Sequence, residues 1–388
     1  MSEALKIGML SWESLHSVRV GGLAQAVTGM AEGLVKNGHE VHVFTRSELD
    51  QSNYDVFNGV HYHRCKFDPG GDIFEHTRKM CDAMIDDIRK VENKSGKFDV
   101  IHGHDWMVAD ALEKLQDHYR VMSFHSTEQG RTVGGGSERI AEKEWLGGYV
   151  SNKVLTVSQA MKSELEEIYQ IPSEKIHVVP NGCFIQDMVK DVDPGRIKEK
   201  YDIHPLAPMI LFLGRMTYQK GPDIMLDAIP HVFDYRGDAE FVLIGDGEMR
   251  WYLEMRANQL GVSHSTRFLG YLPDEDKLDL LNATDVVCIP SRNEPFGLVL
   301  FEAWAAGDAV VASNVGGLRE NIDNFVNGIK TTPSPQPIAW GINFAIDDPE
   351  LVRRLGREGK KKLREFRWDR ICRKLRVIYR DIDKYGGN

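Results

Sequence analysis

Short apolar runs alternate with segments of helical periodicity along the first half of the chain. The runs have the length of buried strands, and glycine-containing or polar loops separate them from the helical segments. A helix expected over residues 23–37 ends at Gly38, the residue type most common just after a helix. We predict strands at residues 5–10, 40–44, 60–64, 100–103, 121–124, 153–157 and 177–179.

The same pattern restarts after a polar, proline-containing connection at residues 186–208. Alternating strands and helices predict parallel sheets covered by helices on both faces. We therefore expect an α/β protein with two doubly wound, Rossmann-like domains, residues 1–185 and 186–366, facing across a cleft where ligands of such sheets bind. Strands are expected at residues 209–213, 241–244, 267–269, 285–290 and 309–313, with a helix at 223–233.

Composition narrows the class of protein. A chain of 388 residues is too long for one ordinary core, which agrees with two domains. The formal charge of −10 argues against a nucleic-acid binder, so positive charge for an anionic substrate has to be local. Five dispersed cysteines predict reduced thiols and neither a disulfide framework nor a zinc site. With no long apolar stretch, we expect a soluble cytoplasmic protein.

The loop at residues 214–221 (GRMTYQKG) combines glycines with two cations. It follows the first strand of the second domain and leads into a helix, so backbone N–H groups and the helix N-terminus can face an anion. Arg215 suits bidentate phosphate contact, and Lys220 supplies a point charge. Together they could neutralise a diphosphate without a metal ion. Taken alone, they could also be two surface cations beside an ordinary loop.

Two glutamates occupy the segment NEPFGLVLFEA at residues 293–303. Pro295 disfavours a helical conformation at Glu294, which places Glu294 in a loop and Glu302 within the following helix. Carboxylates are suited to accept hydrogen bonds from sugar hydroxyls, while Gly297 lets a backbone amide approach a phosphate. The alternative is that both glutamates are surface charges, although Glu302 interrupts an otherwise apolar helix.

The first domain offers weaker signals. The segment RVGGLA at residues 19–24 is not a GxGxxG fingerprint, which argues against a dinucleotide, but its glycines could approach a ligand or simply form a tight turn. His102 and His104 lie at the end of one predicted strand and His125 follows the next, where strand ends should line the cleft. A polar contact to a sugar, a structural role for His102 and a zinc site are the three interpretations, of which zinc lacks a third ligand.

Together these residues resemble family 4 of the retaining glycosyltransferases, which have the GT-B fold, and they are similar to glycogen and starch synthases. The matching segments run in order through nearly the whole chain. They are GGLA at 21–24, HDW at 104–106, His125, PNG at 180–182, GRMTYQKG at 214–221, IGDG at 244–247, EPFGLVLFEA at 294–303 and GGLRE at 316–320.

The resemblance implies roles for single residues. Arg215 and Lys220 would bind the donor diphosphate, Glu294 and His125 would meet the transferred sugar, and these four are the expected catalytic residues. A helix at about residues 367–388 would cross back to the first domain. The substrate-binding positions implied are Arg19, Gly21, Gly22, Asp105, Gly214, Asp246, Tyr271, Leu272, Phe296, Gly297, Leu298 and Glu302.

The resemblance also implies an activity: metal-independent transfer of a hexose, with retention, from an ADP-, UDP- or GDP-sugar to a hydroxyl acceptor. No cofactor and no metal ion are expected. The first expectation is a glucosyltransferase that acts on an α-1,4-glucan. The alternative is a mannosyl- or glucosyltransferase that acts on a small or lipid-linked acceptor. FHSTEQGR at residues 124–131 departs from glycogen synthases. A phosphorylase- or epimerase-like enzyme and a non-catalytic nucleotide-sugar sensor remain as other classes.

Overall fold

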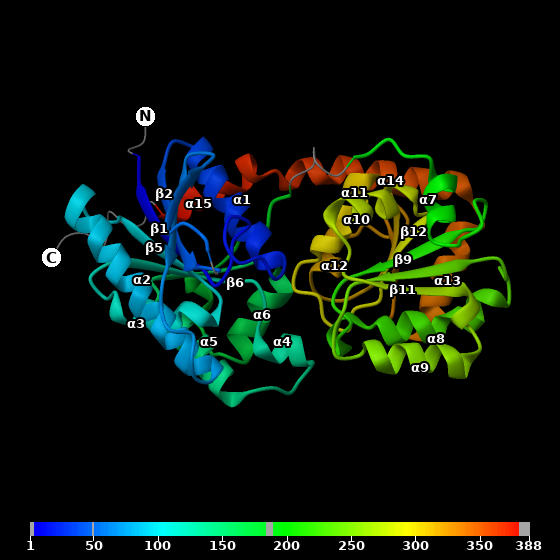
Figure 1. Ribbon diagram of the computed structural model, residues 1–388, viewed down its shortest axis with the longest axis horizontal. Coiled ribbons are helices and arrows are strands. Elements are labelled where there is room, and N and C mark those ends of the chain that lie inside the picture. The colour runs from blue at the N-terminus through cyan, green and yellow to red at the C-terminus, as the bar shows by residue number, and fades with distance from the viewer. Residues whose placement is uncertain (1–3, 49, 184–188, 380–388) are drawn as a thin grey trace. The chain divides into compact units, whose positions relative to one another are not determined.

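The computed structural model describes residues 4–48, 50–183 and 189–379 (Figure 1). The chain divides into two compact units. Among these residues, the first unit comprises the chain up to residue 129, residues 135–182 and the segment from residue 366 onward. The second unit comprises residues 130–134 and the segment that ends at residue 365.

The first unit is built on an eight-stranded sheet in the order β3-β4-β2-β1-β5-β6-β7-β8. All neighbouring strands are parallel except β3 and β4. Strand order reverses at β1, which lies between β2 and β5, and this reversal marks the place where doubly wound sheets bind ligands. The strands are β1 (Lys6–Leu10), β2 (Glu40–Arg46), β3 (Tyr54–Phe57), β4 (Val60–Cys65), β5 (Val100–His104), β6 (Tyr119–Phe124), β7 (Lys153–Thr156) and β8 (Ile176–Val178).

Helices cover both faces of this sheet. Figure 1 shows α2, α3 and α5 on one side and α1 and α15 on the other. The helices of this part of the chain are α1 (Gly22–Lys36), α2 (Ile73–Ser95), α3 (Ala109–Lys114), α4 (Glu128–Thr132), α5 (Glu138–Val150), α6 (Gln159–Glu167) and α15 (Trp368–Tyr379).

Helix α15 packs closely against α1. Trp368 fits over Gly29, where an added Cβ would lie 2.0 Å from the indole Nε1. Cys372 Sγ donates to the carbonyl oxygen of Met30, and Tyr379 is fully buried. The helix therefore belongs to the core of the first unit, and the rest of the stretch expected at about 367–388 lies outside the described residues.

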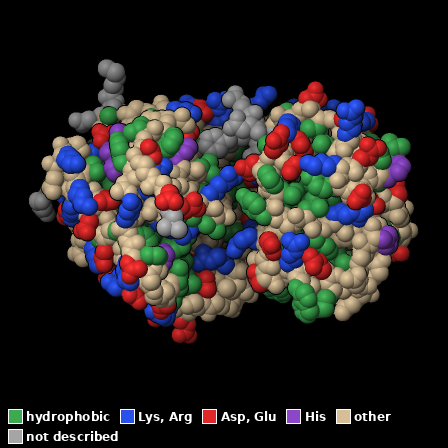
Figure 2. All heavy atoms as spheres, viewed as in Figure 1, with side chains coloured by type: hydrophobic (Ala, Val, Ile, Leu, Met, Phe, Trp, Pro, Cys, Tyr) green, Lys and Arg blue, Asp and Glu red, His purple; other side chains and the backbone are tan. Residues whose placement is uncertain are grey.

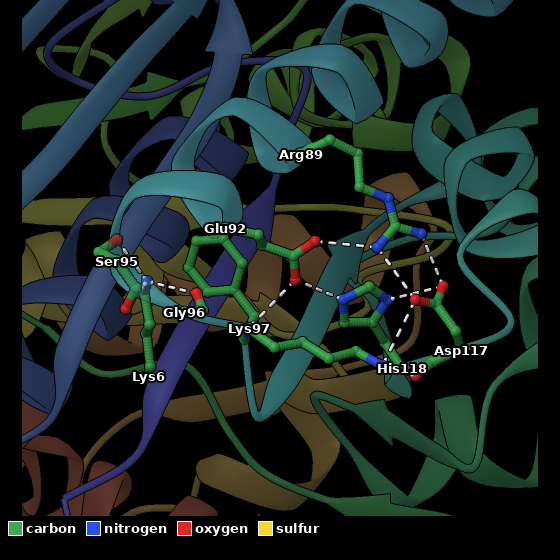
Figure 3. A network of polar contacts seen from close by, with 9 residues as sticks. Lys6, Arg89, Glu92, Ser95, Gly96, Lys97, Asp117 and His118 are labelled. Atoms are coloured by element: carbon green, nitrogen blue, oxygen red, sulfur yellow. Dashed lines mark hydrogen bonds and ion pairs between the residues drawn. The ribbon is translucent and has the colours of Figure 1, made fainter.

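A polar network joins the C-terminal end of α2 to the loops that precede β5 and β6 (Figure 3). Glu92 accepts from His118 Nε2 at 2.7 Å, and Arg89 pairs with Asp117 through Nη1 at 3.0 Å and Nη2 at 2.7 Å. The Phe98 amide also donates to Glu92. These groups lie at the amino edge of the sheet, where they fix the strands rather than approach a ligand at the carboxyl edge.

The second unit holds a six-stranded parallel sheet in the order β11-β10-β9-β12-β13-β14. Its strand order reverses at β9, between β10 and β12. The strands are β9 (Met209–Leu213), β10 (Glu240–Ile244), β11 (Thr266–Gly270), β12 (Val286–Ile289), β13 (Ala309–Ser313) and β14 (Ile329–Thr331). The helices are α7 (Pro194–Lys200), α8 (Pro222–Phe233), α9 (Arg250–Leu260), α10 (Asp274–Ala283), α11 (Leu298–Ala306), α12 (Gly316–Asn321), α13 (Pro335–Ile346) and α14 (Pro349–Lys362).

The expected doubly wound architecture is confirmed in both units. Every predicted strand is present within a few residues, whereas β3 and β14 were missed. Basic and acidic side chains are interspersed over the face shown in Figure 2, without a single basic stripe. Within the described residues, none of the helices is long and apolar enough to cross a membrane.

Candidate functional site

Two loops meet at the strand reversal of the second unit. One follows β9 and contains Arg215 and Lys220, and the other follows β12 and contains Glu294. Strands β9 and β12 are direct neighbours in the sheet, so their carboxyl ends bring both loops to the same place. The order of the strands is therefore enough to bring three of the four expected catalytic residues, Arg215, Lys220 and Glu294, to the same edge of the sheet.

Lys220 and Glu294 form an ion pair within this site. Lys220 Nζ donates to Glu294 Oε1 at 3.0 Å and to Oε2 at 2.8 Å. The Glu294 side chain is 8% exposed and that of Lys220 is 22% exposed, so water screens the pair only partly. Ser291 Oγ donates to Glu294 Oε2 at 3.1 Å. An ammonium group has three N–H donors, so this lysine can still donate to an anion.

Arg292 clamps the two loops together, a role that sequence reasoning missed. Its guanidinium pairs in bidentate fashion with Asp223, Nη1–Oδ1 at 2.8 Å and Nη2–Oδ2 at 2.5 Å. It lies 3.8 Å from the ring centroid of Tyr218, and Nη1 donates to the Tyr218 carbonyl oxygen. The Arg292 amide also donates to the Gln219 carbonyl oxygen at 2.8 Å. The clamp holds the turn Tyr218–Lys220 and thereby sets the position of the Lys220 side chain.

The segment after Glu294 opens helix α11. Gly297 is the N-cap, with φ 99° and no side-chain cap, so the first amides of α11, beginning at Leu298, lack intrahelical acceptors. The Gly317 amide donates to the Glu294 carbonyl oxygen at 2.8 Å. Gly316 has φ 45°, and a Cβ there would lie 2.1 Å from that same oxygen. The GGLRE segment is thus joined to the Glu294 loop. The first amides of α11 form a helix N-terminus of the kind that binds anions.

The other expected residues of the second unit surround these loops. Glu302 is half-buried in the second turn of α11, as the proline argument predicted. Gly214 and Asp246 lie in the loops just after the neighbouring strands β9 and β10, and the Asp246 carbonyl oxygen accepts from the Met216 amide at 2.8 Å. Tyr271 is 80% exposed directly after β11. Three further positions are exposed Arg215, half-buried Leu272 and buried Phe296.

The strand reversal of the first unit carries a second set of residues. The loop after β1 is held by Glu13, whose Oε2 accepts from the amides of Val20 at 2.6 Å and Gly21 at 2.8 Å. Burial raises the pKa of Glu13, and these two amide bonds oppose that rise. Exposed Arg19 and Gly22 flank the clamped turn. Glu13 was missed in the sequence because a lone carboxylate in a loop carries no periodic or motif signal.

Asp105 and His125 come together at the ends of β5 and β6. Asp105 Oδ1 accepts from the His125 amide at 2.8 Å, and the Asp105 amide donates to the Ser123 carbonyl oxygen. Asp105 has φ 59° and ψ 171°, a conformation that is strained for a residue with a side chain. His125 Nε2 lies 3.1 Å from His104 Nδ1. Burial lowers the pKa of His125, and the Asp105 carboxylate opposes that effect.

His102 has the structural role that was one of its three interpretations. Its Nε2 lies 2.7 Å from Ser123 Oγ, and its Nδ1 lies 2.7 Å from the hydroxyl of Tyr379 on α15. Burial lowers the pKa of His102 to about 3, so the ring is neutral at physiological pH. Across the described part of the chain, no group of His, Cys, Asp and Glu side chains could hold a metal ion.

Comparison with family models matches both units. A model of Glycosyltransferase Family 4 covers residues 20–185, and a model of Glycosyl transferases group 1 covers residues 194–362. An uncharacterized glycosyltransferase of Methanocaldococcus jannaschii is 38% identical over 97% of this chain and 98% of its own length. The glycogen synthase of Mycobacterium tuberculosis is 30% identical over 97% and 94%.

A further relative and two solved structures extend the comparison. D-inositol 3-phosphate glycosyltransferase of Xylanimonas cellulosilytica is 28% identical over 94% of this chain and 92% of its own. Sucrose-phosphate synthase of Thermosynechococcus elongatus superposes with a TM-score of 0.81 at 20% identity, over 98% and 100% of the two chains. Anabaena HepE in complex with UDP and glucose gives 0.75 at 21% identity, over 96% and 99%. Both structures share the fold described above.

Proposed function

Because the chain belongs to the family 4 glycosyltransferases and its second unit is of the group 1 type, we propose that it transfers a hexose from a nucleoside-diphosphate sugar to a hydroxyl acceptor with retention of configuration. The observation that carries this proposal is the Lys220–Glu294 pair at the strand reversal of the second unit. The pair holds Lys220 at the loop that leads into α11, and the N-terminus of a helix is suited to bind an anion.

The reaction places its developing charge where these residues can act on it. When the nucleoside diphosphate departs, negative charge grows on the phosphate and oxocarbenium character grows on the sugar. Lys220, Arg215 and the first amides of α11 stabilise the phosphate charge, since preorganised donors cost no reorganisation during the reaction. Removing one such donor typically costs about 10²–10³-fold in turnover.

Glu294 holds the sugar and Lys220 rather than acting as a nucleophile. Both of its carboxylate oxygens are engaged by Lys220, and Oε2 also accepts from Ser291. A carboxylate neutralised in this way is a weak nucleophile but a good acceptor for sugar hydroxyls. Retention then follows from acceptor attack on the face that the leaving group vacates, with a departing phosphate oxygen taking the acceptor proton.

Positive side chains take the place of a metal ion in this proposal. Lys220 and Arg215 together carry two charges, enough to offset most of a diphosphate. Besides these two cations, we expect Glu302 to bind the ribose and the backbone amides of Gly297 and Leu298 to bind the phosphates. Tyr271 and Leu272 are expected beside the base. We therefore expect no dependence on added divalent cations.

An α-1,4-glucan is the proposed acceptor, with glucose as the transferred sugar. The support is the 30% identity to a glycogen synthase along 97% of the chain. A small-molecule acceptor is the second candidate, because a D-inositol 3-phosphate glycosyltransferase is 28% identical over 94% of the chain. In both cases the first unit, through Asp105 and His125, would decide the acceptor.

The test combines binding and turnover. Thermal-shift measurements with ADP-, UDP- and GDP-hexoses, each with and without EDTA, identify the donor from the largest stabilisation. The preferred donor is then incubated with glycogen, with short malto-oligosaccharides and with inositol phosphate, and the anomeric configuration of the product is determined by NMR. Stabilisation by none of the donors, or a product of inverted configuration, would contradict the proposal.

A further inference from the structure

Three aromatic side chains form an exposed cluster on the second unit. Trp340 and Phe344 lie one turn apart on α13, which Figure 1 labels, and Phe325 reaches them from the loop before β14. The Trp340 and Phe344 rings are nearly parallel, with centroids 5.4 Å apart, and Phe325 meets both edge-on, at 6.3 and 5.7 Å. We call these three residues the aromatic platform. They are 41%, 50% and 44% exposed in chain order.

The platform is not a by-product of helix packing. The opposite face of α13 carries Ile338, Ile342 and Ile346, which are buried in the core and pack the helix against α8. The buried isoleucines are therefore enough to pack the helix against the core, and the exposed rings are not needed for folding. Trp340 and Phe344 thus stay exposed to water on a helix without charged residues, and exposed aromatic side chains that lie together favour contact with a partner.

The loop that carries Phe325 is strained and firmly held. Phe325 has φ 62°, in the left-handed region that side chains other than glycine, asparagine and aspartate seldom occupy. Its amide donates to the Gly328 carbonyl oxygen at 2.8 Å, and the Asp323 amide donates to Asn327 Oδ1 at 2.8 Å. The surrounding hydrogen bonds thus maintain a conformation that turns a large apolar ring toward Trp340 and Phe344.

Charge and area narrow the class of partner. Helix α13 (PQPIAWGINFAI) carries no charged residue, whereas surfaces that bind anionic membranes need Lys or Arg beside the apolar residues. Three rings exposed by about half present on the order of 300 Å². A stable dimer needs roughly 800 Å² from each partner. The platform is therefore suited to a neutral, partly apolar ligand that covers only a small area of the protein surface.

Sugar rings meet this description. A pyranose has C–H groups on its faces, which pack against the electron-rich face of an aromatic ring, while its hydroxyls stay in water. Several adjacent rings suit a chain of sugars better than a single sugar. We propose that the aromatic platform is a second, non-catalytic binding site for neutral α-glucan, an inference that rests on the glucan acceptor proposed above. Holding a polymer there raises its effective concentration for the reaction.

The experiment compares Trp340→Ala/Phe344→Ala with the native protein and with Trp251→Ala. Trp251 lies on α9 of the same unit and is 70% exposed, so it controls for the loss of an exposed tryptophan. Affinity electrophoresis in gels containing glycogen should show the double variant binding about tenfold more weakly, equivalent to roughly 1.4 kcal/mol, and the control unchanged. The KM for glycogen should rise in the double variant, with kcat on a short malto-oligosaccharide preserved.

The outcomes separate the two proposals. Equal glycogen binding by the native protein and the double variant would overturn the platform, as would absence of glycogen binding by the native protein. If analytical ultracentrifugation shows a native dimer that the double variant loses, the platform is a protein interface instead. If glycogen binding depends on Trp340 but no hexose is transferred to any glucan, the platform stands and the proposed acceptor fails.

Discussion

The Lys220–Glu294 pair allows stability and catalysis to be measured separately. Lys220→Ala leaves the Glu294 carboxylate, 8% exposed, with Ser291 as its remaining hydrogen-bond donor in this cluster. Removing one partner of a buried pair costs about 3–5 kcal/mol. Because Lys220 is 22% exposed and water can reach the site, we expect about 1–3 kcal/mol. Glu294→Gln in the same chain removes the unpaired charge, so the double variant should recover most of this loss.

Activity should not recover with stability. If Lys220 stabilises the departing diphosphate, both Lys220→Ala and the double variant should lose about 10²–10³-fold in turnover. Unfolding of the native protein, Lys220→Ala, Glu294→Gln and the double variant is measured by calorimetry. Initial rates of the same four proteins are measured with the preferred donor at saturation. Near-native turnover in Lys220→Ala would refute the role of the lysine. A double variant no more stable than Lys220→Ala would refute the buried-charge argument.

Three further predictions concern other parts of the fold. Glu13→Ala frees the Val20 and Gly21 amides and should raise the KM for the donor about tenfold. Glu13→Gln keeps an acceptor oxygen for these amides and should have a KM close to that of the native protein. Equal kinetics for the two variants would contradict the role of Glu13 in holding this loop. The Arg89 guanidinium holds the pKa of Asp117 below its ordinary value. The pair therefore stabilises the fold above about pH 4, and this stabilisation is lost as the pH falls below that value. In acid, the Tm of Asp117→Asn should fall less steeply with pH than the Tm of the native protein. Gly316→Ala forces a Cβ against the Glu294 carbonyl oxygen and should lower Tm sharply, while Gly237→Ala, with open space around its Cβ, should not.

The sequence predicted the architecture well because parallel sheets leave a strong signal. Strands buried on both faces are continuous apolar runs, as in MILFL at 209–213, and they stand out from polar loops. The two missed strands lack that signal. β3 is a mostly exposed antiparallel edge strand, and β14 has only three residues.

The site was predictable where a motif carries the chemistry, and less so where tertiary contacts do. Placing Glu294 in a loop followed from Pro295, but the direct bond from Lys220 to Glu294 needed the neighbouring ends of β9 and β12. The support of His102 by Tyr379 joins residues 277 positions apart, and local patterns hold no information about it. The individual roles in donor binding stay predictions.

The position of α15 in the first unit sets an order for folding during synthesis. Residues 366–379 leave the ribosome after the entire second unit, yet Trp368 fills the space over Gly29 and Gly182, and Tyr379 supports His102. The second unit can therefore complete its core first, while the surface of α1 that α15 later covers stays exposed in the first unit. Removing residues from 366 onward should expose this surface of α1 and leave the first unit dependent on chaperones, with the second unit still folded.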